Sequence, residues 1–336
     1  MASAANRWAP PRAHPDRSTA VSLEELRAAA QGLRGVAVET PLLSVPALAA
    51  RAGVPVLLKG EHLQPVGAFK IRGAYTAISH IPPDIRNRGV ITYSSGNHGL
   101  AVAFAAQRLG IRAVVVMPQR APAIKVEGVR RLGGEAVIAG NSSAERYLRA
   151  QQMAEDEGLI MVPPFESLEV IAGQGTCGLE IIEQCPEVET IVVPVGGGGL
   201  IAGISAAVAA LKPSVQVIGV EPAGAPKLSR ALEAGHPVKL DHTESLADGL
   251  LPLSIGSLPF SVLSGIVRQS VLVEEEQIVS ALRFLYDEGG LSVEPSGAVT
   301  TAALLSGGIR PSGPTVAVVS GGNVDPALFQ RLVHER

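Results

Sequence analysis

The sequence predicts an α/β protein whose parallel sheets are covered by helices on both faces, and three observations support this class. Short apolar segments of strand length alternate with helical patterns along most of the chain. These segments are continuously apolar, as expected for strands that are buried on both faces of a sheet. At 336 residues, of which 46% are hydrophobic, the chain is long enough for about two such domains.

The predicted elements follow one another in the order that this class requires. A capping box formed by Ser22 and Glu25 opens a first helix that ends at Leu33. The predicted strands cover residues 54–58, 89–93, 113–117, 135–139, 190–195, 215–220 and 315–319. The later predicted helices cover residues 99–109, 123–132, 144–157, 170–184, 200–211, 275–288 and 297–305.

Composition and charge exclude several other classes. Lys and Arg total 28 and Asp and Glu total 31, so the net charge of -3 gives no basic surface for nucleic acid or an anionic membrane. Cys177 and Cys185 fit neither a disulfide framework nor a zinc pattern, and we expect reduced thiols in a cytosolic protein. Residues 1–20 lack the apolar core of a secretion signal and are predicted to be a disordered lead-in.

One uncharged stretch has the length of a membrane span. Residues 191–211 contain no Asp, Glu, Lys or Arg across 21 positions. Pro194 and the four glycines that begin at position 196 would break a spanning helix near its start. A buried strand, a glycine turn and a buried helix explain the stretch better, so we expect no association with a membrane.

The glycine run is a candidate anion site. It lies between the predicted strand 190–195 and the predicted helix 200–211, and it consists of Gly196, Gly197, Gly198 and Gly199. Glycine lets the backbone approach an anion, and the free N–H groups and the helix dipole favour a phosphate there. The run also fits a dinucleotide site, because residues 197–202 match G-x-G-x-x-A and Glu221 follows at the spacing of a ribose-binding acid. A glycine turn without a ligand is the third interpretation.

Two further segments carry candidate chemistry. Lys70 lies among small and apolar residues, where burial would lower its pKa and make its amine a nucleophile; a solvated lysine is the alternative. A polar group between the strand 89–93 and the helix 99–109 suggests a site for a small anion such as a carboxylate, and helix capping is its alternative role. The members of this group are Ser94, Ser95, Gly96, Asn97 and His98.

Combined in this order, the segments resemble the fold-type II enzymes that use pyridoxal phosphate, specifically the serine/threonine dehydratase and serine racemase family. Lys70 resembles the lysine that holds the cofactor as a Schiff base, and Asn97 resembles the asparagine beside the pyridine 3′-oxygen. Residues 196–199 match the loop that holds the cofactor phosphate, and Ser320 matches the serine that hydrogen-bonds the pyridine nitrogen. The other cofactor contacts that the resemblance implies are Phe69, Gly249 and Glu294.

The resemblance also implies an architecture. It predicts two open parallel-sheet α/β domains of the tryptophan synthase β-like type, with the cofactor in the cleft between them. The smaller domain, residues 81–165, would be inserted into a larger domain made of residues 21–80 and 166–336. A homodimer in the cytoplasm is expected from the family.

The implied reaction is β-elimination of water from a β-hydroxy amino acid such as L-threonine or L-serine, which gives a 2-oxo acid and ammonia. Lys70 would remove the α-proton as general base, and the neutral Ser320 would make the ring a weaker electron sink than an Asp would. Residues 94–98 would bind the substrate carboxylate. An NAD-dependent dehydrogenase stays a distant alternative, because it leaves Lys70 and this polar group unexplained.

A serine or hydroxyaspartate racemase with two-base chemistry is the nearer alternative. Ser95 immediately precedes the Gly-Asn pair, where threonine dehydratases tend to have Ala and racemases have Ser. Such a serine can reprotonate the α-carbon on the face opposite Lys70, so Ser95 is a second candidate catalytic residue. A capping or carboxylate-binding hydroxyl is the alternative role for Ser95.

Some positions depart from the family pattern. Val66 and Ala68 stand where many members have Thr and Ser, and Leu100 stands where Gln is usual. In metal-dependent members, the Glu of G-V-E-P and an acid six residues later bind a divalent ion, whereas here Glu221 is followed by Lys227. We therefore expect activity without a metal, and Lys227 either replaces the charge of the ion or is a solvated surface lysine.

Overall fold

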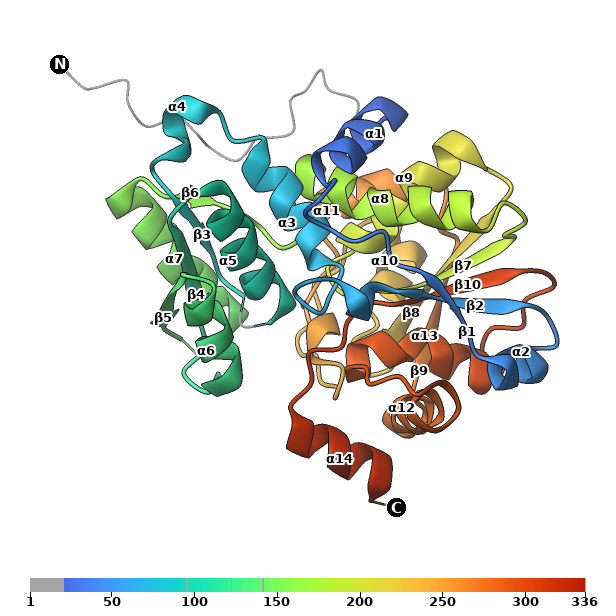
Figure 1. Cartoon of the computed structure of the whole chain (residues 1–336). Helices are drawn as coiled ribbons and strands as arrows, with labels where there is room; N and C mark the ends of the chain where they lie inside the picture. The colour runs from blue at the N-terminus through green and yellow to red at the C-terminus, as the bar shows by residue number, and fades with distance from the viewer. Residues whose placement is uncertain (1–20, 95, 122, 141, 336) are drawn as a thin grey trace.

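The computed structural model describes residues 21–94, 96–121, 123–140 and 142–335, which form two sheets flanked by helices (Figure 1). The predicted mixed α/β class with parallel sheets is therefore confirmed. The disordered lead-in predicted for residues 1–20 and the candidate Ser95 lie outside the described residues.

The larger sheet is made of β1 (Leu42–Ser44), β2 (Val56–Gly60), β7 (Thr190–Pro194), β8 (Gln216–Pro222), β9 (Gln269–Val273) and β10 (Thr315–Val319). Its strand order is β1-β2-β10-β7-β8-β9. β1 is antiparallel to β2, and the other neighbouring pairs of this sheet are parallel. β10, the last of the described strands, thus lies in the middle of the sheet.

The smaller sheet is made of β3 (Val90–Thr92), β4 (Ala113–Met117), β5 (Glu135–Ile138) and β6 (Ile160–Met161). Its strands are all parallel, in the order β5-β4-β3-β6. They come from one continuous stretch of the chain that lies between β2 and β7 in the sequence, and Figure 1 shows them to the left of the larger sheet.

Helices cover both faces of each sheet (Figure 1). The described helices that come before β7 in the sequence are α1 (Leu23–Gly32), α2 (Pro46–Ala52), η1 (Glu61–Leu63), α3 (Lys70–Ser79), α4 (Pro83–Arg86), α5 (Asn97–Leu109), α6 (Ala123–Arg131), α7 (Ser143–Glu157) and α8 (Leu168–Gln184). The later ones are α9 (Gly199–Leu211), α10 (Lys227–Ala234), η2 (Asp248–Leu250), α11 (Ser257–Leu263), α12 (Glu275–Gly289), α13 (Pro295–Leu305) and α14 (Pro326–His334).

The two faces of the larger sheet bury separate apolar clusters. Val316 and Val318 of β10 pack into a cluster with residues of α8, α9, α10 and α11. Ala317 and Val319 of the same strand pack on the opposite face, in a cluster with residues of α2, α12 and α13. Side chains alternate between faces along a strand, so a strand that is covered on both sides needs an unbroken apolar sequence.

Several elements differ from the prediction. α5 begins at Asn97, two residues earlier than predicted, so part of the polar group forms the first turn of the helix.

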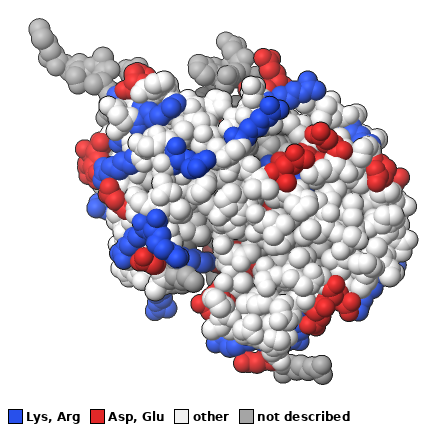
Figure 2. Space-filling view, in the orientation of Figure 1, with Lys and Arg blue, Asp and Glu red and all other residues white. Residues whose placement is uncertain are grey.

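The uncharged stretch 191–211 consists of β7, the glycine turn and α9, as predicted. No helix in the described part of the chain is long and apolar enough to cross a membrane. On the face drawn in Figure 2, basic and acidic side chains are interspersed, in keeping with the small net charge.

Candidate active site

Three of the predicted site segments follow the carboxyl ends of parallel strands. The polar group at 94–98 follows β3, the glycine run follows β7, and Ser320 follows β10. Loops at the carboxyl ends of parallel strands are the usual place for ligand sites in open α/β sheets.

The loop before α3 is joined to the loop after β10. The backbone N–H of Phe69 donates to the carbonyl of Ser320 at 3.1 Å, and that of Gly322 donates to the carbonyl of Gly67 at 2.8 Å. Gly67 has a φ of 70°, and a Cβ there would collide with the side chain of Asn323. These contacts bring Lys70, the first residue of α3, next to Ser320.

Lys70 is half-buried in the structure. Its Nζ donates to the carbonyl oxygen of Pro164 at 3.0 Å and lies 5.1 Å from the centre of the Phe69 ring. Burial lowers the pKa of Lys70 to about 8, and the Glu294 carboxylate opposes this shift. Near neutral pH, a larger fraction of this amine is therefore unprotonated and nucleophilic than for a solvated lysine.

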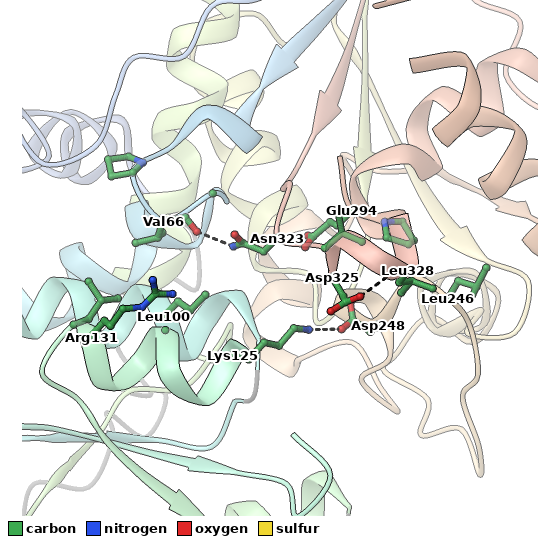
Figure 3. A pocket seen from close by; sticks show the side chains of 16 residues that line it. Val66, Leu100, Lys125, Arg131, Leu246, Asp248, Glu294, Asn323, Asp325 and Leu328 are labelled. Atoms are coloured by element: carbon green, nitrogen blue, oxygen red, sulfur yellow. Dashed lines mark hydrogen bonds and ion pairs between the residues drawn. The ribbon is translucent and has the colours of Figure 1, made fainter. Parts of the chain in front are cut away.

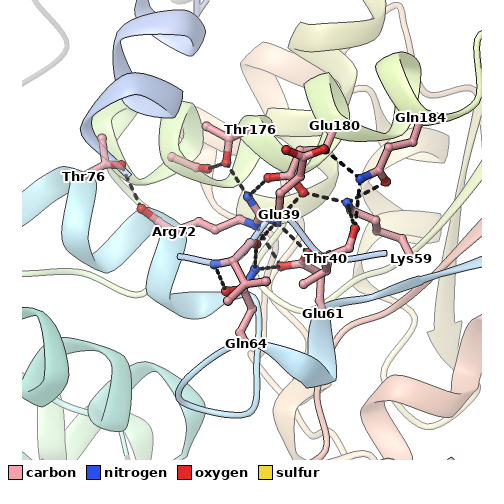
Figure 4. A network of polar contacts seen from close by, with 12 residues as sticks. Glu39, Thr40, Lys59, Glu61, Gln64, Arg72, Thr76, Thr176, Glu180 and Gln184 are labelled. Carbon is pink, nitrogen blue, oxygen red and sulfur yellow. Dashed lines mark hydrogen bonds and ion pairs between the residues drawn. The ribbon is translucent and has the colours of Figure 1, made fainter. Parts of the chain in front are cut away.

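A buried polar network fixes the first turn of the same helix (Figure 4). The guanidinium of Arg72 donates to both carboxylate oxygens of Glu61, at 2.8 and 2.7 Å. It also donates to both oxygens of Glu180 on α8, at 2.6 and 2.7 Å. Lys59 of β2 makes a second ion pair with Glu180 at 2.6 Å. The network thus ties the helix that begins at Lys70 to β2, η1 and α8.

The glycine turn is too crowded for side chains. Gly198 has a φ of 94°, in the region that favours glycine. A Cβ at Gly197 would overlap the ring of Phe165, and one at Gly196 would lie 2.9 Å from the carbonyl oxygen of Gly249. Because Gly198 caps α9 without any side-chain hydrogen bond, the first N–H groups of that helix can bind an anion.

Asn97 links the two sheet regions through its amide group. Its Nδ2 donates to Oε1 of Glu294 at 2.8 Å, and its Oδ1 accepts from Nδ2 of Asn323 at 2.8 Å. Nδ2 of Asn323 also donates to the carbonyl of Val66 at 2.7 Å. Burial raises the pKa of Glu294 to about 8, and the charge of Asp248 acts in the same direction.

Ser320 and Gly249 lie on either side of Ser296. The buried hydroxyl of Ser320 donates to the carbonyl of Ser296 at 3.3 Å, and the N–H of Gly249 donates to Oγ of Ser296 at 3.0 Å. The Ser320 side chain is neutral, as a partner for an unprotonated ring nitrogen would be.

The structure does not bring every side chain of the polar group into the cleft. The His98 ring is buried, and its Nε2 donates to the carbonyl of Val162 at 3.1 Å. Burial and the charge of Lys70 lower the pKa of His98 to about 3, so the ring is neutral. Oγ of Ser94 accepts a long hydrogen bond, 3.4 Å, from the N–H of Gly96. Ser95, the residue predicted to act as the second base, lies outside the described residues.

A cavity of about 530 Å³ opens between the two sheet regions beside these residues. Leu100, Lys125 and Arg131 line it from the side of the smaller sheet, and Asp248 and Glu294 line it from the other side (Figure 3). Nζ of Lys125 pairs with Oδ2 of Asp248 at 2.8 Å across this cleft.

Some site residues were missed by the sequence analysis. Asn323 belongs to the matched segment that begins at Ser320, so this motif could have indicated it. Pro164 contributes a backbone carbonyl, for which no side-chain pattern exists. Lys125 and Phe165 belong to no recognised motif, and only the fold brings them to the site.

The solvated-surface alternative for Lys227 is wrong. The side chains of Lys227 and Glu221 are both 0% exposed, and Nζ lies 3.3 Å from Oε1 of Glu221. In the described residues, no group of three or more His, Cys, Asp and Glu side chains is arranged to hold a metal.

Comparison with known proteins decides the family. The family described as "Pyridoxal-phosphate dependent enzyme" matches residues 33–321. The chain belongs to this family. It is therefore an enzyme that uses pyridoxal phosphate, and the dinucleotide interpretation of the glycine run is left without support.

The relatives include both predicted activities. An L-threonine ammonia-lyase from Thermotoga maritima is 41% identical over 316 residues, which cover 94% of this chain and 79% of that protein. A serine racemase from Oryza sativa subsp. indica is 38% identical over 323 residues, which cover 94% of this chain and 95% of that protein. The solved structure of maize serine racemase matches with a TM-score of 0.90 and 37% identity, covering 93% of this chain and 96% of that one.

The described residues fit the cofactor. The cofactor carries an aldehyde, a phosphate and a pyridine nitrogen. The half-buried lysine of lowered pKa can react with the aldehyde, and the glycine turn before a helix can bind the phosphate. The buried neutral hydroxyl can hydrogen-bond the nitrogen. The members of this set are Lys70, Ser320 and the glycines 196–199.

Proposed function

We propose that the protein is a pyridoxal-phosphate-dependent ammonia-lyase that converts a β-hydroxy amino acid such as L-threonine or L-serine to a 2-oxo acid and ammonia. The observation that carries this proposal is the position of Lys70, an amine of lowered pKa that lies beside Ser320 at the cleft between the sheet regions. The similarity to threonine ammonia-lyases over most of the chain supports the same activity.

Each residue has a defined task in this proposal. Bound pyridoxal phosphate supplies an electron-withdrawing ring that stabilises negative charge at the substrate α-carbon. Lys70 would hold the cofactor, and its amine would remove the substrate α-proton as general base. The N–H groups of residues 196–199 hold the phosphate, and Ser320 donates a hydrogen bond to the ring nitrogen.

The remaining site residues orient the ring and the substrate. Asn97, which is hydrogen-bonded to Glu294, would hold the ring, and Phe69 and Gly249 would contact it. The substrate carboxylate is bound at the start of α5 by backbone N–H groups and by Ser94, Ser95 and Asn97. His98 contributes its backbone, because its ring is bonded to Val162.

Replacing Lys70 by Ala tests the central assignment. The variant is expected to lose both the visible absorbance of the covalently bound cofactor and the release of 2-oxo acid from L-threonine. Lys239→Ala, which removes an exposed lysine, serves as the matched control and should keep both. Covalent cofactor absorbance that survives in Lys70→Ala would refute the assignment.

A second activity, racemisation, is favoured by Ser95 and by the serine racemase relatives. A panel of L- and D-β-hydroxy amino acids, scored separately for 2-oxo acid release and for inversion, separates the two reactions. If Ser95 supplies the second proton, Ser95→Ala loses inversion and keeps elimination. Inversion that persists in this variant would rule out the two-base role.

We also infer two domains, with residues 81–165 inserted between residues 21–80 and 166–336. The continuous stretch that forms the smaller sheet supports these boundaries. A homodimer in the cytoplasm completes the proposal, and light scattering of the purified holoenzyme measures the mass that decides the oligomeric state.

A further inference from the structure

A buried ion pair lies at the carboxyl end of β8, outside the cleft. Glu221 belongs to β8 and Lys227 is the first residue of α10, and both side chains are 0% exposed. The ammonium lies 3.3 Å from Oε1 of Glu221 and donates to the carbonyl oxygen of Ala225 at 2.9 Å. One carboxylate and one carbonyl therefore face the same positive charge.

The carboxylate is fully engaged by its surroundings. Oε1 accepts from the N–H of Leu228 at 2.7 Å, and Oε2 accepts from the N–H of Ser229 at 2.9 Å. The hydroxyls of Ser229 and Ser270 also donate to Oε2, at 3.2 and 2.9 Å. Glu221 thereby joins β8 to α10 and β9, and the ion pair is neutral as a whole.

Oxygens of these two kinds also bind hard cations. Carboxylate and carbonyl oxygens on one turn are the ligands that Mg²⁺ and Ca²⁺ use in proteins. Here the ammonium of Lys227 occupies the position between these oxygens, so a divalent ion finds neither room nor an uncompensated negative charge. Burial lowers the pKa of Lys227, and the Glu221 carboxylate opposes this shift.

The turn that this pair closes supports one wall of the cleft. The carbonyl of Gly224 accepts from the N–H of Glu244 at 3.1 Å, and a Cβ at Gly224 would collide with the Glu244 carbonyl. The chain then continues to Gly249, whose carbonyl lies against Gly196 of the glycine turn. Loss of the ion pair should therefore disturb this wall of the cleft.

We propose that Lys227 is a built-in cation, which takes the place of the divalent ion that metal-dependent members of the family bind at this position. The metal that the family implies does not fit the residues present here. The chain therefore needs no metal at this turn, and an acidic residue at position 227 would create a divalent-cation site.

The test compares Lys227→Glu with Lys227→Met as holoenzymes. We expect the wild type to melt at the same temperature in EDTA and in Mg²⁺ and to bind no Mn²⁺ in equilibrium dialysis. Lys227→Glu should melt roughly 5 °C or more lower in EDTA, recover in Mg²⁺ or Mn²⁺, and bind one Mn²⁺ per chain. Lys227→Met should melt lower in both conditions, because a thioether cannot bind these ions.

Neither readout involves the substrate. Failure of this proposal can therefore be distinguished from failure of the proposed reaction. It is wrong if the wild type binds Mn²⁺ and loses this binding in Glu221→Gln. It is also wrong if Lys227→Glu is folded but binds no Mn²⁺. If Lys227→Glu fails to fold even with Mn²⁺ present, while Lys227→Met folds, the proposal is likewise overturned.

Discussion

Glu294 places a carboxyl group of raised pKa close to the amine that the proposed reaction uses. Its carboxylate raises the pKa of Lys70, against the larger effect of burial. Glu294→Gln removes this charge, so the pKa of Lys70 should fall further below about 8. We expect the apoprotein of this variant to combine with pyridoxal phosphate at lower pH than the wild type does.

The measurement is the rate at which visible cofactor absorbance appears, recorded against pH. Glu276→Gln removes an exposed carboxylate and is the matched control, with an unchanged midpoint. A midpoint that rises or stays constant in Glu294→Gln would show that the carboxylate does not act on Lys70.

His98 should make the fold sensitive to acid. Its pKa is lowered from 6.5 to about 3, so between these values the unfolded chain binds a proton that the folded protein does not. The stability is complete above pH 6.5 and falls as the pH drops below it, by up to about 1.4 kcal/mol per pH unit. In urea titrations from pH 7 to 5, His98→Gln should lose less stability than the wild type.

The exposed His236 gives the matched control for this measurement. His236→Gln should follow the wild-type dependence on pH. Equal pH dependence for the wild type and His98→Gln would exclude His98 as the group responsible.

Single residues could be predicted where a side chain and its chemistry occur in a recognisable segment. Lys70, Asn97 and Ser320 were selected as candidates in this way, and the structure brings their segments together at one cleft. The burial of Lys227 could not be predicted, because its cause is the packing of α10 against the sheet. The direction of the His98 ring was missed for a similar reason, since its partner is a backbone carbonyl.

At the scale of elements, α3 depends on the ion network around Arg72. This guanidinium is 1% exposed and is paired with two carboxylates, one of which is 0% exposed. Arg72→Met leaves the buried Glu61 carboxylate without its ion-pair partner, which should cost about 3–5 kcal/mol of the free energy of unfolding. Urea denaturation of the holoenzyme measures this loss.

Arg112→Met is the matched control, because Arg112 also pairs with two carboxylates but is 42% exposed. We expect this variant to lose no more than about 1 kcal/mol. If the two variants lose similar amounts, the buried network does not hold α3 in place as described.

Elements were predicted best where the sequence has a long or strongly apolar pattern. The strands at 113–117 and 315–319 agree with the structure at both ends, and the helices α8 and α12 agree within about a turn. β1 and β6 were missed, because segments of three and two residues are too short to show a periodic hydrophobic pattern. β9, at the edge of the sheet, was missed because it begins with two polar residues and only three apolar residues follow.

At the scale of the whole molecule, the Lys125–Asp248 pair is a contact between the sheet regions. The side chain of Asp248 is 58% exposed, so the pair should stabilise the fold by less than about 1 kcal/mol. Its removal should instead loosen η2. We expect Lys125→Met to speed hydrogen exchange at the amides of residues 248–250, with little change in melting temperature.

Arg230→Met provides the comparison, because the ion pair of Arg230 with Glu233 lies within α10. Exchange at residues 248–250 should not change in this variant. Unchanged exchange in Lys125→Met would mean that the pair does not connect the two regions mechanically.

The strand order of the larger sheet has a consequence for biosynthesis. The smaller sheet comes from one stretch of chain that ends at Met161, so a nascent polypeptide can complete it early. β10 separates β2 from β7, and the ribosome translates it after all the other described strands. Until Val319 has emerged, β2 and β7 have no common neighbour, and Lys70 and Ser320 cannot meet. The site that Lys70 and Ser320 form can therefore assemble only after β10 has been translated.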